Sequence, residues 1–340
     1  MIFRRGERVA VADTCVRFHP KVTLLGVVLG AVVIAGAWSS AAFAEFPEKP
    51  MRVIVPNPAG SNSDLIMRLL APRLAEVLGQ NIVIDNRPGG NGMIANNVVR
   101  SSVPDGYTVL FGTATNLAGD ASVTNREFDP VREFSAIGLI ATLPYVLVVN
   151  NLLPVKSVRE LVEFAKARPN KLTYAYTPGG SLYAGFLFAR LAGLQSTAVP
   201  YNSGPQAMTA IVSGEVNFMF YPFQALSTQI NANRMRAIAT TAAVRPSWMA
   251  AVPTMVESGF PDLDFGTFVG LYVPAKTNKN VIGIASKAML QVLKDSALQA
   301  KYAEVGTVLT LLSPTESDKY TEAAVRKYQE LEKLSGGRPN

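Results

Sequence analysis

The stretch that decides the fold is RVIVPNPAGSNSDLIMRLLAPRLAEVL, residues 52–78. An apolar run over residues 53–55 ends at Pro56, small and polar residues follow, and a helical pattern begins at Ser63. We interpret Ser63 as the N-cap and Asp64 as a first-turn carboxylate that suits the helix dipole. A strand, a small-residue loop and a helix start leave backbone N–H groups facing one point, which suits an anion. A capped helix without a ligand explains this loop equally well.

The same order of elements recurs along the chain. Short apolar strands alternating with helices predict an α/β fold with mainly parallel sheets. Ser157 with Glu160 predicts a capped helix start, and Gly79 and Gly193 predict helix ends. The expected strands are 52–55, 82–85, 107–111, 145–149, 172–175, 198–200, 216–220, 236–240, 269–273 and 308–311, and the expected helices are 63–78, 93–101, 157–167, 182–192, 205–213, 225–232, 280–293, 297–305 and 314–334.

Five loops between a strand and a helix are candidates for binding, because ligands of open α/β sheets lie beyond the carboxyl ends of strands. In the loop 86–92 we expect Arg87 to form a structural ion pair. Tyr201, in the loop before the expected helix 205–213, suits packing as well as ligand contact. The candidate ligand residues are Asn57, Ala59, Gly60, Ser61, Asn62, Ser63, Asp64, Asn116, Thr177, Gly180, Ser181 and Tyr201. Gly60 permits a positive φ or a close backbone approach.

The first 44 residues have the pattern of a secretory signal peptide. Five basic residues precede an apolar run over residues 24–37, and Ala42-Phe43-Ala44 is a small-x-small cleavage site. We therefore expect cleavage, a mature chain that begins near Glu45, and a location in the periplasm. A retained membrane anchor is the alternative, although the apolar run is short for a membrane span.

The composition excludes several kinds of chemistry. Cys15 and His19 are the only residues of their types, and both lie in the expected signal peptide. The rest of the chain therefore offers no disulfide, no His or Cys metal ligand and no Ser-His-Asp arrangement, and we expect neither metal nor cofactor. The formal charge of +7 falls to about +4 without residues 1–44. Because the basic residues are scattered, we do not expect nucleic-acid binding.

Several motifs along the chain resemble those of the tripartite tricarboxylate transporter substrate-binding proteins, also called the Bug family. They are FPEKPMRVIVPNPAGSNSD, DNRPGGNG, PDGYTVLFGT and VPYNSGPQAMTAIVSGEVNFMF, followed by Val252-Pro253-Thr254 and Glu257-Ser258-Gly259. Each motif is weak alone, but their order and spacing cover nearly all residues after the expected cleavage site.

The resemblance implies a periplasmic receptor with the two-lobed type II periplasmic-binding-protein fold and a ligand cleft between the lobes. We expect residues 45–147 with 267–340 to form a discontinuous domain 1, and residues 148–266 to form domain 2. The stretches 144–149 and 268–274 would be the crossing strands of the hinge. Residues 57–64 of one lobe, and residues 177–181 with Tyr201 and Asn217 of the other, would enclose the ligand.

The chain departs from the family pattern at three positions. Gly60-Ser61 replaces a pair of glycines, Asn57 stands where an aromatic residue is common, and Asn217 stands where the family usually has Asp. These changes leave the expected fold intact, but they bear on which ligand is bound.

The resulting hypothesis is a receptor that captures a small aliphatic or aromatic carboxylate and delivers it to a tripartite tricarboxylate-type membrane permease. Its partners would be that ligand and the permease subunits, and we expect a monomer. One alternative is a binding protein that reports the ligand to a signalling partner. The other is a periplasmic enzyme using carboxylate chemistry or a serine such as Ser61 or Ser181, although no histidine is present to activate it.

Overall fold

The computed structural model describes residues 46–118, 128–177, 180–263, 266–304 and 306–334. The expected signal peptide, Pro178, Gly179 and the last six residues lie outside this set. Residues 46–340 form one compact unit. No helix of the described residues is long and apolar enough to cross a membrane.

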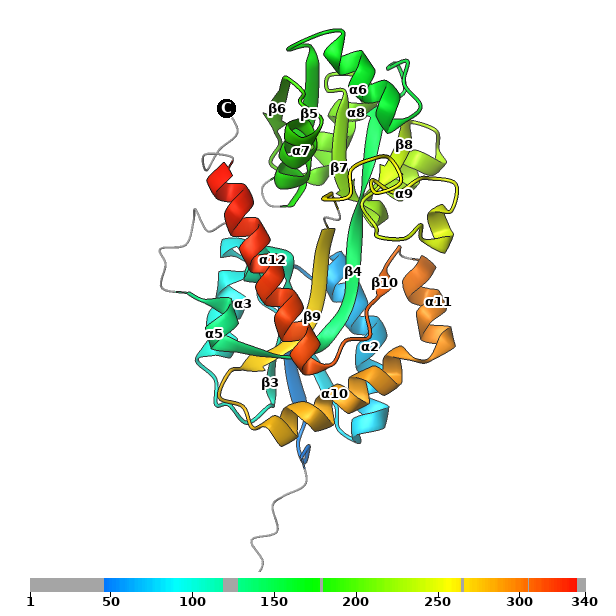
Figure 1. Cartoon of the computed structure of the whole chain (residues 1–340). Coiled ribbons are helices and arrows are strands. Elements are labelled where there is room, and N and C mark those ends of the chain that lie inside the picture. The colour runs from blue at the N-terminus through cyan, green and yellow to red at the C-terminus, as the bar shows by residue number, and fades with distance from the viewer. Residues whose placement is uncertain (1–45, 119–127, 178–179, 264–265, 305, 335–340) are drawn as a thin grey trace, which may run out of the picture. The chain divides into compact units, whose positions relative to one another are not determined.

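Ten strands form one mixed sheet within the described residues (Figure 1). The main path has the order β2-β1-β3-β9-β4-β7-β5-β6, and β8 and β10 also pair with β4. The strands are β1 (Met51–Val55), β2 (Ile82–Asn86), β3 (Thr108–Thr113), β4 (Phe134–Asn150), β5 (Leu172–Tyr176), β6 (Ser196–Pro200), β7 (Phe218–Pro222), β8 (Met235–Thr240), β9 (Gly266–Pro274) and β10 (Val308–Leu309).

Helices follow most strands, as the alternating pattern predicts. The helices are α2 (Asn62–Leu78), α3 (Met93–Arg100), α4 (Ala114–Leu117), α5 (Pro130–Glu133), α6 (Val158–Lys166), α7 (Gly180–Leu191), α8 (Gly204–Ser213), α9 (Phe223–Asn231), α10 (Lys279–Leu293), α11 (Ser296–Glu304) and α12 (Pro314–Leu334), with short 3-10 turns at Gly90–Gly92 and Ser247–Met249.

Strand β4 divides the sheet into two regions. Its residues 134–144 pair with β9 and β10, and its residues 145–150 pair with β7 and β8. We call the region of β2, β1, β3, β9, β10 and the first part of β4 sheet 1. The region of the second part of β4 with β7, β5, β6 and β8 is sheet 2.

The expectation of mainly parallel sheets is corrected by β4 and β9. Among the described strands, four pairs are parallel, namely β1 with β2, β1 with β3, β5 with β6 and β5 with β7. Every antiparallel pair involves β4 or β9, because these two strands run against their neighbours. Strand β4 passes from one region to the other at Pro144. Strand β9 instead pairs only within sheet 1, so the stretch 268–274 is not a crossing strand.

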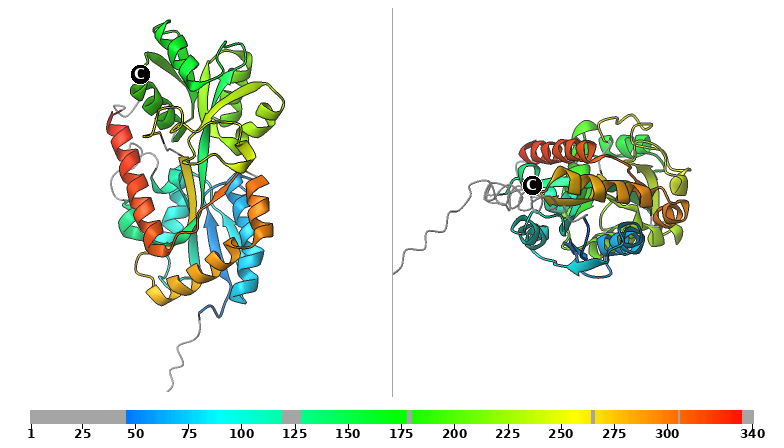
Figure 2. Two further views of the ribbon diagram at one scale, coloured as in Figure 1. Left: turned by 45° about the vertical axis from the view of Figure 1, so that its right-hand side comes forward. Right: turned by 90° about the horizontal axis from the view of Figure 1, so that it is seen from below.

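The hydrophobic core lies on the faces of both regions. Helices α2, α10 and α11 cover one face of sheet 1, where Ile66, Met289 and Tyr302 are fully buried. Helices α2 and α11 lie side by side (Figure 2), and the Tyr302 hydroxyl donates to the Ile66 carbonyl oxygen at 2.9 Å. Helix α12 packs along β4, and it also contacts α4 after β3 and α7 after β5. It therefore touches a helix that follows a strand in each region.

The predicted helix start at Ser157 and the predicted helix end at Gly79 agree closely with the structure. The Ser157 side chain accepts the Glu160 N–H at 3.2 Å, and Gly79 ends α2 at φ 67°. The largest difference is the beginning of β4, because the strand starts at Phe134 and not at Tyr145. Residues of this first part are buried on both faces, so the alternation that marks a half-exposed strand is missing.

Candidate functional site

The carboxyl ends of the parallel strands in sheet 1 and sheet 2 face each other across the middle of β4. Thr113 at the end of β3 lies opposite Val269 of β9, which lies opposite Ala141 of β4. Pro222 at the end of β7 lies opposite Tyr145 of β4. Strand β3 runs in the direction of β4, and β7 runs against it. The two strand ends therefore point toward each other, about 13 Å apart along β4.

The first turn, residues 57–64 after β1, is one of the predicted binding loops. Gly60 has φ 79°, so of the two possibilities considered for this glycine the positive φ is present. The N-cap is Ser61 and not Ser63, because the Ser61 side chain accepts the Asp64 N–H at 3.4 Å and α2 begins at Asn62. Asn62 and Ser63 thus lie in the first helical turn, where their N–H groups have no intrahelical acceptor. Ala59 is exposed, and Asn57, Ser61, Asn62 and Ser63 are partly exposed.

The buried carboxylate of Asp64 holds the first turn in place through hydrogen bonds. Its carboxylate accepts hydrogen bonds from the Gly60 N–H at 2.8 Å, from Arg68 Nε at 2.7 Å and from Asn86 Nδ2 at 3.1 Å. Asn86 also donates to the Asn57 carbonyl oxygen at 3.0 Å. The Arg68 hydrogen bond, with those from Gly60 and Asn86, holds the pKa of Asp64 below its ordinary value although burial opposes this. Asp64 is 1% exposed, so it orders the loop rather than presenting a charge.

In the described part of the second turn, residues 177–181 after β5, the hydrogen bonds join uncharged groups. The Thr177 N–H donates to Ser181 Oγ at 2.8 Å, and the Ser181 hydroxyl donates back to the Thr177 carbonyl oxygen at 3.0 Å. Ser181 is buried, whereas Thr177 and Gly180 are partly exposed. Gly180 begins α7, and its first N–H groups have no intrahelical acceptor.

Three tyrosines that the sequence analysis did not select surround this turn. A Cβ on Gly180 would overlap the Tyr145 hydroxyl and lie 2.9 Å from the Tyr328 hydroxyl. Tyr145 and Tyr328 hydrogen-bond to each other, and burial raises the pKa of both. The Tyr221 hydroxyl hydrogen-bonds to Thr177 and fills the space where Gly204 has no side chain. The three tyrosines come from β4, β7 and α12, so no local spacing could have grouped them.

The loop before α8 reaches the same edge of sheet 2. The Tyr201 N–H donates to the Tyr176 carbonyl oxygen at 2.9 Å. The Tyr201 side chain lies along α8, because its hydroxyl donates at 2.8 Å to Glu215, two residues beyond that helix. Burial and Glu215 raise the pKa of Tyr201 to about 12. Ser203 is the N-cap of α8, but its side chain makes no capping hydrogen bond and is partly exposed.

Asn116 lies at the correct edge of sheet 1, but its side chain is used within that region. Its Oδ1 accepts the Thr113 N–H at 2.6 Å and the Thr113 hydroxyl at 3.0 Å. Its Nδ2 donates to Asn96 Oδ1 at 2.7 Å, and the residue is 4% exposed. The side chain therefore caps α4 and joins it to α3.

Asn217 lies at the opposite end of sheet 2 from the second turn. Its Oδ1 accepts the Thr173 N–H at 2.8 Å and the Thr173 hydroxyl at 3.1 Å. Thr173 stands at the beginning of β5 and Thr177 follows its end, which separates them by about 13 Å along the strand. The structure therefore does not bring Asn217 to the other candidates. Arg87 forms the expected ion pair, with its Nε 3.0 Å from Asp85 Oδ1.

The arrangement can offer hydrogen-bond donors, but little charge. The turns present the N–H groups of three helix starts, together with hydroxyls of Ser63, Ser203 and Tyr221. Both arginines beside the first turn, Arg68 and Arg87, are already paired with Asp64 and Asp85. Within the described residues, no group of three or more His, Cys, Asp or Glu could hold a metal. Neutral donors and helix dipoles of this kind suit a small anion.

Known proteins resemble this chain in sequence and in structure. The family described as "Tripartite tricarboxylate transporter family receptor" matches residues 66–333. A UPF0065 protein from a TAR-I intergenic region of Agrobacterium vitis is 30% identical over 341 residues, which cover 98% of this chain and 94% of the relative.

Solved structures show the same fold. That of an R. palustris protein with adipate has a TM-score of 0.73 and 28% identity, covering 86% of this chain and 99% of that chain. The periplasmic binding protein BugD has a TM-score of 0.69 and 26% identity, also covering 86% and 99%. The fold is therefore the two-lobed fold of periplasmic solute-binding proteins, and the chain belongs to the tripartite tricarboxylate transporter family of receptors.

Proposed function

We propose that this protein is a periplasmic receptor that captures a small carboxylate between the first and second turns and delivers it to a tripartite tricarboxylate-type membrane permease. The observation that carries the proposal is the register of β4, which turns the carboxyl ends of β3 and β7 toward each other. An acid with a polar group at each end could be bound by both edges at once. Binding to both sheet regions would stabilise the ligand-bound arrangement of the protein.

The proposed contacts follow from which hydrogen-bond donors lie in the turns at the facing strand ends. We assign contact to Asn57, Ala59, Gly60, Ser61, Asn62 and Ser63 of the first turn, and to Thr177, Gly180 and Ser181 of the second. Ser203 and Tyr221 are added, because their hydroxyls lie at the same edge. Asp64 and Asn116 would support the site from behind, since their side-chain oxygens already accept internal hydrogen bonds. Tyr201 and Asn217 are directed elsewhere by their bonds to Glu215 and Thr173.

A carboxylate fits these donors better than a neutral solute does. Helix N-termini favour negative charge, and anion–amide hydrogen bonds are stronger than neutral ones. The R. palustris relative was solved with adipate, a dicarboxylate, which supports the same class of ligand for this chain. The alternative of catalysis has no activating histidine in the residues that follow the expected signal peptide. We therefore propose binding without turnover.

A thermal-shift screen tests the proposal. The protein, purified as exported from an expression host, is tested against aliphatic and aromatic carboxylates, amino acids and neutral analogues. A ligand at a hundred times its dissociation constant adds about 2.7 kcal/mol to stability, so a true ligand raises Tm clearly. We expect rises confined to carboxylates, and mass spectrometry should recover the bound acid unchanged. Rises only with neutral compounds, or a converted acid, would contradict the proposal.

A further inference from the structure

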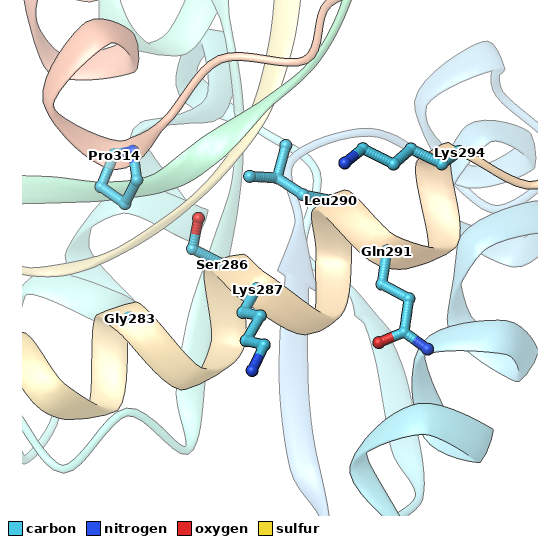
Figure 3. A pocket seen from close by; sticks show the side chains of 7 residues that line it. All are labelled: Gly283, Ser286, Lys287, Leu290, Gln291, Lys294 and Pro314. Atoms are coloured by element: carbon cyan, nitrogen blue, oxygen red, sulfur yellow. The ribbon is translucent and has the colours of Figure 1, made fainter.

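A groove lies along helix α10 (Figure 3), and none of the residues that line it belongs to either turn. Its volume is about 600 Å³, and Pro314 at the start of α12 forms its opposite wall. The residues that line it are Gly283, Ser286, Lys287, Leu290, Gln291, Lys294 and Pro314. All of these except Pro314 lie on α10 or, for Lys294, at its C-cap, and each is three or four residues from another, so they form a single face over about three turns.

Two lysines line the groove, and within the described residues their charges form no ion pairs. Lys287 and Lys294 are exposed, and within the residues that the structure describes neither has an ion-pair partner. Two carboxylates are close in sequence to the groove, but both cap helices. Asp295 accepts the Ala297 N–H at 2.8 Å, and Glu316 accepts the Ser313 N–H at 2.9 Å and its hydroxyl at 2.6 Å. The lysines, seven residues apart on one face, are separated by about 10 Å.

Ser286 supplies a second and independent observation. It is 3% exposed, and among the residues that the structure describes its hydroxyl has no hydrogen-bond partner. Figure 3 shows the hydroxyl directed across the groove toward Pro314. A buried hydroxyl without a partner is rare in folded proteins and lowers stability, which is explained if another molecule completes its hydrogen bond.

We infer that the α10 groove binds an acidic amphipathic helical segment of a partner protein. Two carboxylates about two turns apart would meet Lys287 and Lys294, and an apolar side chain between them would contact Leu290. A Cβ on Gly283 would have no atom within 4 Å, so this position leaves room for a close approach. A second copy of this chain is a poor occupant, because a symmetric contact would bring the same lysines together. If the proposed function holds, the partner is the permease, and that identification rests on it.

A designed helical peptide tests the groove directly. It carries two glutamates seven residues apart with a leucine between them, and its binding to the purified protein is followed by fluorescence anisotropy. We expect Lys287→Glu with Lys294→Glu to weaken binding by about tenfold or more, since like charges then oppose each other. The matched control, Lys166→Glu with Lys171→Glu, makes the same change of net charge at exposed sites outside the groove. It should change binding less than about twofold.

Two further variants make the result specific. A peptide with lysines in place of its glutamates should bind the charge-reversed protein better than the wild type. Ser286→Ala should weaken the original peptide by roughly threefold to tenfold while Tm stays the same or rises, because the removed hydroxyl had no partner. Absence of peptide binding, or an equal loss in the control variant, overturns the inference. Binding of phosphatidylglycerol vesicles in place of the peptide would also overturn it.

Uptake by cells separates this inference from the proposed function. In a strain that lacks the gene, the charge-reversed protein should restore uptake of the carboxylate about tenfold less well than the control variant does. Its affinity for that carboxylate should match the wild type, because none of the residues that line the groove belongs to either turn. Failure of the proposed function would appear earlier, as no carboxylate hit in the thermal-shift screen, and the peptide measurement would still decide the groove. A changed carboxylate affinity, or equal uptake with both variants, counts against the groove.

Discussion

The first turn and the second turn follow equivalent strands, β1 and β5, and each opens a helix, but different kinds of bonds hold them. In the first turn, a buried carboxylate accepts from a backbone N–H, an arginine and an amide. In the second, hydroxyls of Thr177 and Ser181 bond to each other and tyrosines pack around them. The same anion-binding geometry can thus be supported by an ion pair or by neutral groups, and the two turns should respond differently to substitution and pH.

Removing the carboxylate of the first turn should have the largest effect. Asp64→Ala leaves the Gly60 N–H, Arg68 and Asn86 without their acceptor, and we expect a loss of about 3 kcal/mol in the free energy of unfolding. Urea unfolding measures it. Glu163→Ala is the control, because its ion pair with Arg159 is exposed and should contribute less than about 0.5 kcal/mol. Equal losses in the two variants would show that the first turn is not held by Asp64.

Substitution by alanine should cost more stability at Gly180 in the second turn than at Gly60 in the first. Gly180→Ala forces a methyl group against the Tyr145 and Tyr328 hydroxyls, and we expect a loss of about 2 kcal/mol from overpacking. Gly60→Ala meets no atom within 4 Å, so only the φ of 79° opposes it, at about 1 kcal/mol. Thermal unfolding of the two variants measures the order. A larger loss of stability in Gly60→Ala would mean that Tyr145 and Tyr328 shift at little cost to accommodate the new methyl group.

Substitutions of Ser63 and Ser181 distinguish a residue that only contacts the ligand from one that also stabilises its turn. Ser63 has no side-chain hydrogen bond within the described residues, so Ser63→Ala should weaken carboxylate binding by about 1–2 kcal/mol with stability unchanged. Ser181→Ala should lower both, because it also removes the bonds to Thr177. Gly60→Val should weaken binding more than either serine variant, since the branched side chain strains the first turn. Calorimetric titration with a hit from the screen measures all three, and unchanged affinity in Gly60→Val would place the site elsewhere.

The smallest expected effect is the change in the stability of the two turns with pH. A protonated carboxyl keeps its shape and some of its hydrogen bonds, so protonation costs less stability than a substitution does. The folded pKa of Asp64 is lowered from 3.8, so its stabilisation is complete above that pH and is lost as the pH falls further. The folded pKa of Tyr145 is raised from 10.0, so its stabilisation is present below pH 10.0 and is lost as the pH rises. Acid should therefore weaken the first turn and alkali the second.

Matched variants read out this pH dependence. The stability gap between wild type and Asp64→Asn should narrow below pH 3.8, and that between wild type and Tyr145→Phe should narrow above pH 10.0. Urea unfolding across pH measures both gaps. A stability gap that stays constant with pH would mean that titration of the corresponding residue does not affect the stability of its turn.

Sequence patterns predicted the ten strands and the place of both turns, because periodicity, glycine positions and helix starts are local features. They did not predict that Ser61 rather than Ser63 caps α2, since both stand before apolar residues at suitable spacing. Nor did they indicate where the Asn116, Tyr201 and Asn217 side chains point. The bonding partners Thr113, Glu215 and Thr173 compete with any ligand, and sequence alone does not rank such competition.

The residues that the sequence analysis missed share a different property. Tyr145, Tyr221 and Tyr328 meet only because β4 lies beside β7 and α12 packs against α7. Their spacing along the chain carries no period, and each alone is typical of a core aromatic residue. The beginning of β4 was missed for a related reason, because a strand buried on both faces shows no alternation.

The pairing of β4 with β9 also sets the order in which a newly synthesised chain can complete its sheet. Phe134 pairs with Pro274, and Ala136 donates its N–H to Asp318, 182 residues later. Tyr302 reaches back 236 residues to Ile66. Such distant contacts make folding slow, and a ribosome that has produced only the first two-thirds of the chain has produced strands β1 to β3 without their neighbour β9. Until these last segments are available, the β3 edge has no partner in β9 and is open to other chains.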